Sequence, residues 1–371
     1  IMLSGTSSQI VNQTSGNGLA NFATNAATGS FTINSGRNFT TAGNFTNNGT
    51  LTVGGGSKFD VNGSLTNFNS TSGTLTGGTY NVTGTLQFNG ANIKTNAANI
   101  TLTGTSSQIV NQTGVNGLSN FATNASSGSF TLAGNRNLTA AGSFSNAGTL
   151  KISKGSTFTV GAKGNYTQTK GQMTVDGTLA LTSSGAITIS GGSVFGNGGT
   201  FSGSLTSSGT LNIGDALKQA GKEAITQDYT QTLAGLMNVD IGGTTVGAQY
   251  DQLDITDVAS LNGILNLDLI NNFVPTIGEQ FDILNFGAKS GTFSTVHGTG
   301  INNNEHFQVV YNASNVTLDV VAGAAALSMS GSSPSPSPTP EPSTLLLLGC
   351  GLVGMGGLMR QGFKRNRKRE V

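Results

Sequence analysis

Apolar and polar residues alternate in short stretches along most of the chain. Each stretch has Gly at its second position, and an apolar residue then tends to occupy every second position. A period of two predicts strands with one buried face, and the turn residues end each strand after a few positions. The stretches are NGTLTVG at 48–54, SGTLTGG at 72–78, TGTLQFN at 83–89, AGTLKIS at 147–153, DGTLALT at 176–182, SGAITIS at 184–190 and SGTLNIG at 208–214.

A long segment of the chain occurs twice. Residues 4–32 and residues 103–131 are nearly the same at an offset of 99, and 37 of the 57 positions from Gly5 to Val61 are identical at that offset. A solenoid grows by adding coils, whereas a closed barrel cannot double without losing closure. We therefore expect an all-β fold, an elongated right-handed parallel β-helix (β-solenoid), with roughly 20 residues per coil.

The pattern changes after residue 214. Residues 215–236 interrupt the alternation, and their first half predicts one or two helical turns. Alternation with larger apolar residues then resumes, and this part resembles the C-terminal passenger region of autotransporter adhesins. The resemblance implies that residues 215–322 close the solenoid and protect its last strand. It rests on GGT at 242–244, YDQL at 250–253, LNG at 261–263, the spacing of Phe273, Pro275 and Gly278, FDIL at 281–284 and GTF at 291–293.

The C-terminal part has three segments of different composition. Residues 323–339 form a Ser/Pro linker, since alternating Pro favours an extended spacer. Residues 343–359 are uncharged and apolar, long enough to predict a single transmembrane helix at the short end of the usual range. The basic residues that follow predict a cytoplasmic C-terminus by the positive-inside rule. They are Arg360, Lys364, Arg365, Arg367, Lys368 and Arg369.

The order of these segments resembles the PEP-CTERM sorting signal of Gram-negative bacteria. The resemblance covers residues 340–371 and rests on Pro340-Glu341-Pro342, the apolar span and the basic cluster. It implies that Pro340, Glu341 and Pro342 are recognised by an exosortase, a transpeptidase-like membrane protease that cuts near them. It also implies transient residence in the inner membrane, followed by transfer to the cell surface, outer membrane or extracellular matrix. Cys350, the only cysteine, lies inside the apolar span.

Charge is distributed unevenly, although the net charge is only +1. Residues 1–214 contain two acids and eight bases, and residues 215–342 contain thirteen acids and three bases. No run of bases interleaved with aromatic residues occurs in the body, so we expect no nucleic-acid partner. The chain starts at Ile1 without a charged and apolar leader. Since the tail requires export, we expect that a signal peptide precedes this sequence.

Candidate catalytic and metal residues are sparse. A glycosidase or lyase needs paired carboxylates or a Ca²⁺-carboxylate cluster, yet residues 1–214 offer only Asp60 and Asp176. Residues 240–268 hold five aspartates, which predict an acidic solvated face because no calcium-loop motif is present. His297 and His306 lack zinc-ligand spacing. Thr-x-Thr pairs at 50–52, 74–76 and 101–103 do not recur at the constant spacing of an ice-binding face, and their middle residues should be buried.

These observations favour a structural or adhesive surface protein. We expect no enzymatic activity, no cofactor and no metal, with extracellular polysaccharide as a further partner. Two alternatives remain open: a carbohydrate-active β-helix enzyme (lyase or hydrolase) whose active residues lie ahead of Ile1, and a spacer for a binding domain in that missing part. The expected domains are a duplicated solenoid at 1–214, a closing segment at 215–322, the linker at 323–339 and the sorting signal at 340–371.

Overall fold

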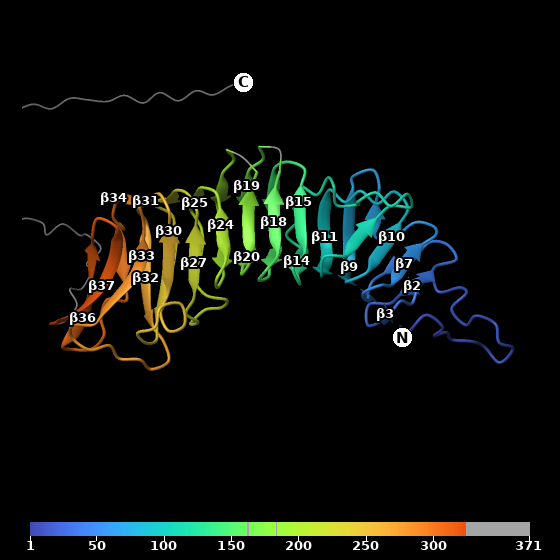
Figure 1. The fold of residues 1–371 in the computed structure, drawn as a ribbon, viewed down its shortest axis with the longest axis horizontal. Coiled ribbons are helices and arrows are strands. Elements are labelled where there is room, and N and C mark those ends of the chain that lie inside the picture. Colours follow the sequence, from blue (N-terminus) through green and yellow to red (C-terminus); the bar gives the residue numbers. More distant parts are fainter. Residues whose placement is uncertain (162, 183, 324–371) are drawn as a thin grey trace, which may run out of the picture. The chain divides into compact units, whose positions relative to one another are not determined.

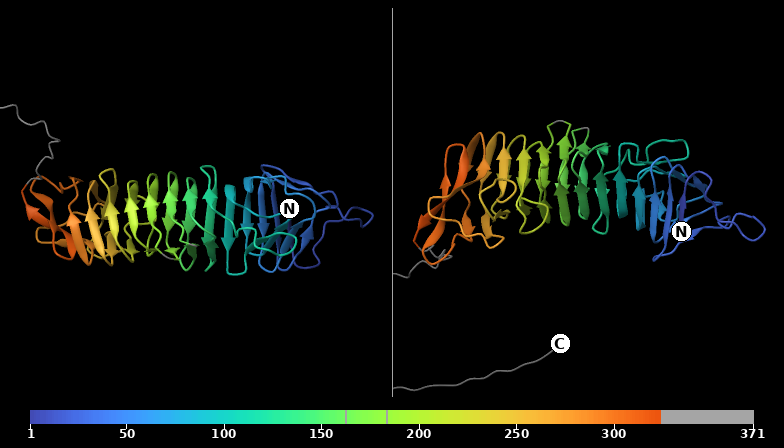
Figure 2. Two further views of the ribbon diagram at one scale, coloured as in Figure 1. Left: turned by 90° about the horizontal axis from the view of Figure 1, so that it is seen from above. Right: turned by 60° about the horizontal axis from the view of Figure 1, so that its bottom comes forward.

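The computed structural model describes residues 1–161, 163–182 and 184–323 (Figure 1). Within these ranges the chain forms strands, turns and loops, with no helix. Strands from successive coils lie side by side in a stack that follows the sequence from one end to the other (Figures 1 and 2). The expected all-β fold and the β-solenoid architecture are confirmed, since neighbouring coils pair mainly through parallel strands.

Each regular coil contributes one strand to each of three faces. Face 1 is a continuous series of parallel pairs that runs the length of the body. Its strands in order are β1 (Met2–Ser4), β3 (Ser30–Asn34), β6 (Thr50–Val53), β9 (Thr74–Val82), β11 (Thr95–Thr103), β14 (Ser129–Ala133), β17 (Thr149–Ile152), β20 (Gln172–Val175), β23 (Ser193–Phe195), β26 (Thr210–Asn212), β29 (Leu236–Ile241), β32 (Ile264–Leu269) and β35 (Thr295–His297).

Face 2 precedes face 1 in each coil and is built from shorter strands. Its pairs are parallel, except that β8 (Phe68–Asn69) pairs antiparallel with β9. The first halves of β9 and β11 also lie on this face. The other strands are β2 (Thr24–Asn25), β5 (Thr46–Asn47), β13 (Thr123–Asn124), β16 (Phe144–Asn146), β19 (Tyr166–Gln168), β22 (Ile187–Ile189), β25 (Leu205–Ser207), β28 (Tyr229–Gln231), β31 (Val258–Leu261) and β34 (Ala288–Gly291).

Face 3 consists of two sheets in succession. The first contains β4 (Phe39–Thr40), β7 (Lys58–Val61), β10 (Thr85–Phe88) and β12 (Gln108–Val110). The second contains β15 (Asn137–Ala140), β18 (Thr157–Val160), β21 (Thr178–Leu181), β24 (Thr200–Ser202), β27 (Lys222–Ile225), β30 (Gln252–Ile255), β33 (Gln280–Asn285), β37 (Asn315–Ala322) and β36 (Glu305–Tyr311).

Coil length varies along the stack: Thr50 pairs with Thr79 and Asn99 with Ser129, so two coils near the N-terminal end take 29 and 30 residues. Ser30 pairs with Thr50, Phe144 with Tyr166 and Lys222 with Gln252, so these coils take 20, 22 and 30 residues. The coils of 20 and 22 residues agree with the expected coil length of roughly 20 residues. The longer coils place additional loop residues outside the stack.

The core is a set of rows in which apolar side chains of successive coils lie on one another. On face 1 every second residue points inward because a strand alternates its side chains between two faces. Each inward residue meets its register partner in the next coil, so apolar area is buried continuously. One such row contains Phe31, Leu51, Tyr80, Ile100, Phe130, Leu150, Met173, Val194, Leu211, Met237 and Leu265, all buried.

Face 2 adds an interior row of side-chain amides. Asn96 Nδ2 donates to Asn124 Oδ1 at 2.9 Å, Asn124 Nδ2 to Asn146 Oδ1 at 2.8 Å, and Asn146 Nδ2 to Gln168 Oε1 at 3.1 Å. In the first repeat, Asn25 Nδ2 donates to Asn47 Oδ1 at 2.8 Å. All these residues are buried. Every donor points toward the C-terminal side, so the row has a direction, and its amides satisfy one another away from water.

The helical turns expected within residues 215–236 are wrong. Residues 215–218 form bends and turns, residues 219–221 have no regular structure, and Lys222–Ile225 is strand β27. This strand pairs in parallel with both β24 and β30, so its backbone groups are satisfied by neighbouring coils. Tertiary pairing overrides the local helix propensity of the Ala- and Lys-containing segment.

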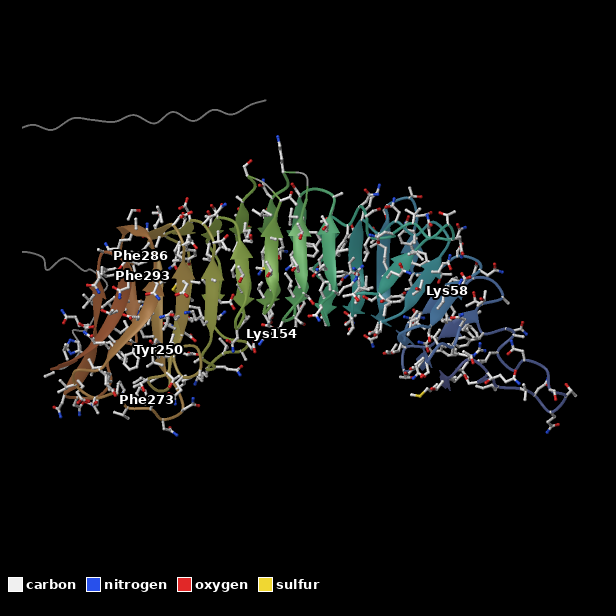
Figure 3. The ribbon with its side chains drawn as sticks, in the orientation of Figure 1. Lys58, Lys154, Tyr250, Phe273, Phe286 and Phe293 are labelled. Atoms are coloured by element: carbon white, nitrogen blue, oxygen red, sulfur yellow. The ribbon has the colours of Figure 1, made fainter. Side chains whose placement is uncertain are left out.

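Face 3 ends in antiparallel strands at the C-terminal end of the body. β37 pairs with β33 and β36, both antiparallel. Aromatic side chains gather here, and Figure 3 shows Tyr250, Phe273, Phe286 and Phe293 toward this end. The Phe281 ring lies 5.3 Å from that of Tyr250 and 6.0 Å from that of Phe307, between centroids. These aromatic side chains thus fill the core at the C-terminal end of the described body.

Candidate functional site

The predicted sorting and membrane residues lie outside the described residues. These are Pro340, Glu341 and Pro342, the apolar span 343–359, and the basic residues from Arg360 to Arg369. Across residues 1–161, 163–182 and 184–323, no helix has the length and apolar character needed to cross a membrane. The membrane orientation therefore stays a prediction.

The two acids of the repeat region are each held by a lysine. Asp60 Oδ2 lies 3.7 Å from Lys58 Nζ, and its Oδ1 accepts a hydrogen bond from Gln112 Nε2 at 3.0 Å. Asp176 Oδ2 lies 3.2 Å from Lys151 Nζ. Asp60 is on β7 and Asp176 follows β20, so the structure does not bring the pair together.

Asp176 instead joins two acids from the 215–223 segment. Burial, and then the neighbouring carboxyl group of Asp176, raise the pKa of Asp215. Glu223 lies beside them, and both aspartates add to its unfavourable ionisation. The sequence offers only Asp60 and Asp176 as acids in residues 1–214, and this cluster was not expected from it. The alternation of Lys222-Glu223-Ala224-Ile225 was the available signal, because it puts Glu223 in phase with the buried Ile225.

Glu223 is the most deeply buried of these acids, with 2% of its surface exposed. Burial raises its pKa to about 9, a shift that the hydrogen bond from Gly199 N (3.3 Å to Oε1) partly offsets. Gly196 and Gly199 leave the room that the carboxyl group fills, since a Cβ on either would collide with it. At neutral pH the site therefore holds a protonated carboxylic acid.

A small cavity lies under the 215–221 segment near Asp240. Its volume is about 90 Å³, and it is lined by Asn212, Ile213, Ala216, Leu217, Lys218, Asn238, Asp240, Asp251 and Asp268. Asp240 and Asp268 are register partners on neighbouring coils. Three of the five aspartates of residues 240–268 therefore meet here, whereas Asp254 binds Lys222 Nζ at 2.7 Å and Asp257 is exposed.

The carboxyl group of Asp251 holds backbone groups in place. It accepts hydrogen bonds from Gly221 N and Asp240 N, both at 2.7 Å. Burial raises the pKa of Asp251 to about 8, against the effect of these two donors. Burial and then the charge of Asp268 raise the pKa of Asp240 to about 6. In the part of the chain that the structure describes, no group of three or more His, Cys, Asp or Glu is placed to hold a metal ion.

The outer side of face 1 is an ordered polar surface. Its outward residues stack in register from coil to coil, about 4.8 Å apart. One row contains Ser30, Thr50, Thr79, Asn99, Ser129, Thr149, Gln172, Ser193 and Thr210, all at least partly exposed. A second row contains Thr32, Thr52, Asn81, Thr101, Thr131 and Lys151. We call these two rows the polar face.

The Thr-x-Thr pairs occupy different parts of the solenoid. Thr50–Thr52 and Thr101–Thr103 lie on face 1, whereas Thr74–Thr76 lies on the face 2 half of β9. Their middle residues Leu51, Leu75 and Leu102 are buried, as expected. On face 1 Ser, Asn, Gln and Lys interrupt the threonines, so the rows present mixed hydroxyl and amide groups.

Comparison with known proteins identifies the C-terminal segment. Residues 338–361 match the family model of the PEP-CTERM protein-sorting motif. The match includes Pro340-Glu341-Pro342, the whole apolar span and Arg360. No curated protein matches the chain. The chain is thus a β-solenoid body that carries a PEP-CTERM sorting motif. The motif implies an exported protein with an exosortase as its processing partner and the cell surface or extracellular space as its destination.

Proposed function

We propose that this protein is a non-enzymatic structural or adhesive component of the cell surface or extracellular matrix. In this proposal the inner membrane holds the span 343–359 transiently with the basic cluster in the cytoplasm, and the exosortase cuts near Pro340-Glu341-Pro342. The freed body then contacts extracellular polysaccharide through its polar face.

The in-register rows of hydroxyl and amide groups carry this proposal. They extend over successive coils of face 1, and Lys151 is the single charged member of the two rows. Such groups both donate and accept hydrogen bonds, which suits the hydroxyls of a neutral glycan. Many weak contacts along one surface add up to a firm attachment when they are engaged together. Because the rows carry little charge, the attachment should depend weakly on salt.

The sorting step is tested by replacing Pro340, Glu341 and Pro342 with alanine in the full-length exported protein. We expect the natural motif to give a cut body at the surface or in the matrix, detected by fractionation and by the mass of the C-terminal peptide. The variant should stay uncut in the inner membrane. A control with Pro334, Ser335 and Pro336 replaced by alanine alters the same linker outside the motif and should be cut normally. Equal processing of all three proteins would overturn the role of the motif.

The polar face is tested by glutamate substitutions on alternate coils, Thr50→Glu, Asn99→Glu and Thr149→Glu. The matched control places Thr85→Glu, Thr157→Glu and Thr200→Glu at outward positions of face 3. Binding of residues 1–323 to the neutral polysaccharide fraction of the producing cells' own matrix is measured by co-sedimentation. We expect the face 1 variant to lose at least about tenfold in affinity, or 1.4 kcal/mol, while the control binds normally. Equal binding by both variants, or no binding by the unaltered body, would contradict the proposal.

A further inference from the structure

The two copies of the repeat have the same sequence at one point but a different environment. Ser-Gln-Ile-Val-Asn-Gln-Thr occupies residues 8–14 and again residues 107–113. Ile10 and Val11 are 40% and 45% exposed, whereas their counterparts Ile109 and Val110 are 0% and 5% exposed. Leu19 and Phe22 are only partly buried, while Leu118 and Phe121 are buried. The second copy therefore shows what the first copy looks like when it is covered.

The cover of the second copy is the preceding coil. Strand β10 pairs in parallel with β12, which places Leu86 beside Ile109 and Gln87 beside Val110. Ile93 N donates to Gly117 O at 2.6 Å, and Ala122 N donates to Lys94 O at 3.0 Å. In the first copy, residues 9–11 form no strand, and Val11 makes an isolated bridge to Asn17. The loop that contains them projects beyond the stack at the N-terminal end in Figures 1 and 2.

The amide row ends at the same surface with an acceptor. In the second copy, Asn124 Oδ1 accepts from Asn96 Nδ2 at 2.9 Å. Its counterpart Asn25 is buried and uses its Nδ2 group on Asn47 Oδ1 and Thr50 O. Among the described residues, no donor is within hydrogen-bond geometry of Asn25 Oδ1. Asn25 Oδ1 is not among the buried polar atoms that lack a partner, so it is open at this surface and can accept an amide donor there.

We infer that the N-terminal end of the stack docks another coil of the type formed by residues 72–99, through the C-terminal side of that coil. The docking surface, here called the N-terminal face, is formed by Ser8, Ile10, Val11, Leu19, Phe22 and Asn25. The docked coil belongs to the same polypeptide. It stands in the same register to Ile1 as residues 72–99 stand to Ile100. It adds a strand parallel to residues 9–11, covers Ile10 with a Leu86-like side chain and donates an Asn96-like amide to Asn25. The repeat array thereby continues on this side by the contacts that join the two copies.

A second copy of this chain fits the surface less well. Two N-terminal faces would present Asn25 acceptors to each other without donors, because both Nδ2 bonds of Asn25 point away from the face. At the opposite end, face 3 finishes in the antiparallel strands β37 and β36, so it offers no parallel edge there to pair with residues 9–11. A coil with the amide polarity of residues 72–99 has the complementary donor.

The duplication provides the test. Ile100 is the counterpart of Ile1, so residues 46–99 can be fused directly ahead of residues 1–323 with Asn99 joined to Ile1 in the natural frame. Backbone amide exchange is compared at residues 9–11 and 108–110, with and without the fusion. We expect the amides of residues 9–11 to exchange at least about tenfold more slowly in the fusion, equivalent to about 1.4 kcal/mol of local stability. The matched control carries Leu86→Asp within the fused segment only and should leave residues 9–11 unprotected.

A pair of substitutions tests the same idea in the unfused body. Ile109→Asp should lower the melting temperature, because it buries a carboxylate in the contact with β10. Ile10→Asp should leave the melting temperature unchanged in the unfused body and lower it in the fusion. Equal exchange of residues 9–11 in fused and unfused proteins would overturn the inference. So would an unfused body that sediments as a dimer and loses the dimer in Ile10→Asp, because a second copy would then be the occupant.

Discussion

Glu223→Gln is expected to stabilise the body at alkaline pH and to weaken its pH dependence. Burial raises the pKa of Glu223 to about 9, from 4.5 for the free side chain. Between these two values the folded state keeps a proton that the unfolded chain has lost. The unfolded state therefore binds fewer protons, and the free energy of unfolding falls as pH rises. The contribution of Glu223 is most favourable below pH 4.5 and becomes a growing cost up to about pH 9.

The size of this cost follows from the pKa difference. One pH unit within the window corresponds to about 1.36 kcal/mol, so the change from about pH 5.5 to about pH 8.5 costs on the order of 4 kcal/mol. Glutamine has nearly the same shape and does not titrate, so it removes this term while filling the space beside Gly196 and Gly199. We expect the variant and the natural protein to be similar near about pH 5 and to diverge above it.

The assay is urea denaturation of residues 1–323 followed by circular dichroism at the two pH values. Asp257→Asn is the matched control, because it makes the same carboxyl-to-amide change at an exposed position. The control should lose as much stability as the natural protein between the two pH values, and Glu223→Gln clearly less. If Glu223→Gln lost the same amount within about 1 kcal/mol, which exceeds the usual extrapolation error, the assignment of a buried protonated Glu223 would be refuted.

Further predictions concern the amide row, the turns and the core, each measured by thermal or urea denaturation of residues 1–323. Asn124→Ala should cost about 1–3 kcal/mol, because it leaves partners of the buried amide row unpaired, whereas Asn120→Ala on the surface should cost little; equal losses would argue against the row. Gly148→Ala should destabilise strongly, because a Cβ there would collide with the carbonyl oxygens of Ala125 and Gly128, whereas Gly142→Ala has open space. Leu150→Ala should cost about 2–5 kcal/mol, and a loss no greater than that of the outward Thr149→Ala would contradict the core assignment.

The sequence predicts strands well where alternation and a Gly turn coincide. Strands β6, β10 and β17 start at the Thr of a Gly-Thr-Leu stretch, at Thr50, Thr85 and Thr149. The Gly turn sets where the strand starts, and the buried Leu sets which of its faces points inward. The PEP-CTERM motif is also readable, because it consists of contiguous residues in a fixed order. The polar face is less visible, because its rows depend on coil lengths that vary between neighbouring coils.

Features that depend on contacts across coils escaped prediction. Local propensity favoured helical turns near Lys222, but the pairing of β27 with β24 and β30 decided the structure. Asp176 precedes Asp215 by 39 residues and Glu223 by 47, so their meeting depends on which coils are neighbours in the stack. The exposed Ile10 and the buried Ile109 have identical local sequences, so no local rule distinguishes them.

The stacking of coils has a mechanical consequence for a protein pulled from its C-terminal side. Each coil is bonded mainly to the coils before and after it, so we expect a load to detach one coil at a time from the loaded end. The antiparallel β36 and β37 meet the load first, because they are the last strands before residue 323. A released coil of 22 residues, such as the one between Phe144 and Tyr166, adds about 75 Å of extended chain. It shortens the stack by only about 5 Å. We therefore expect the body to lengthen stepwise under shear, one coil at a time, while the remaining coils stay folded.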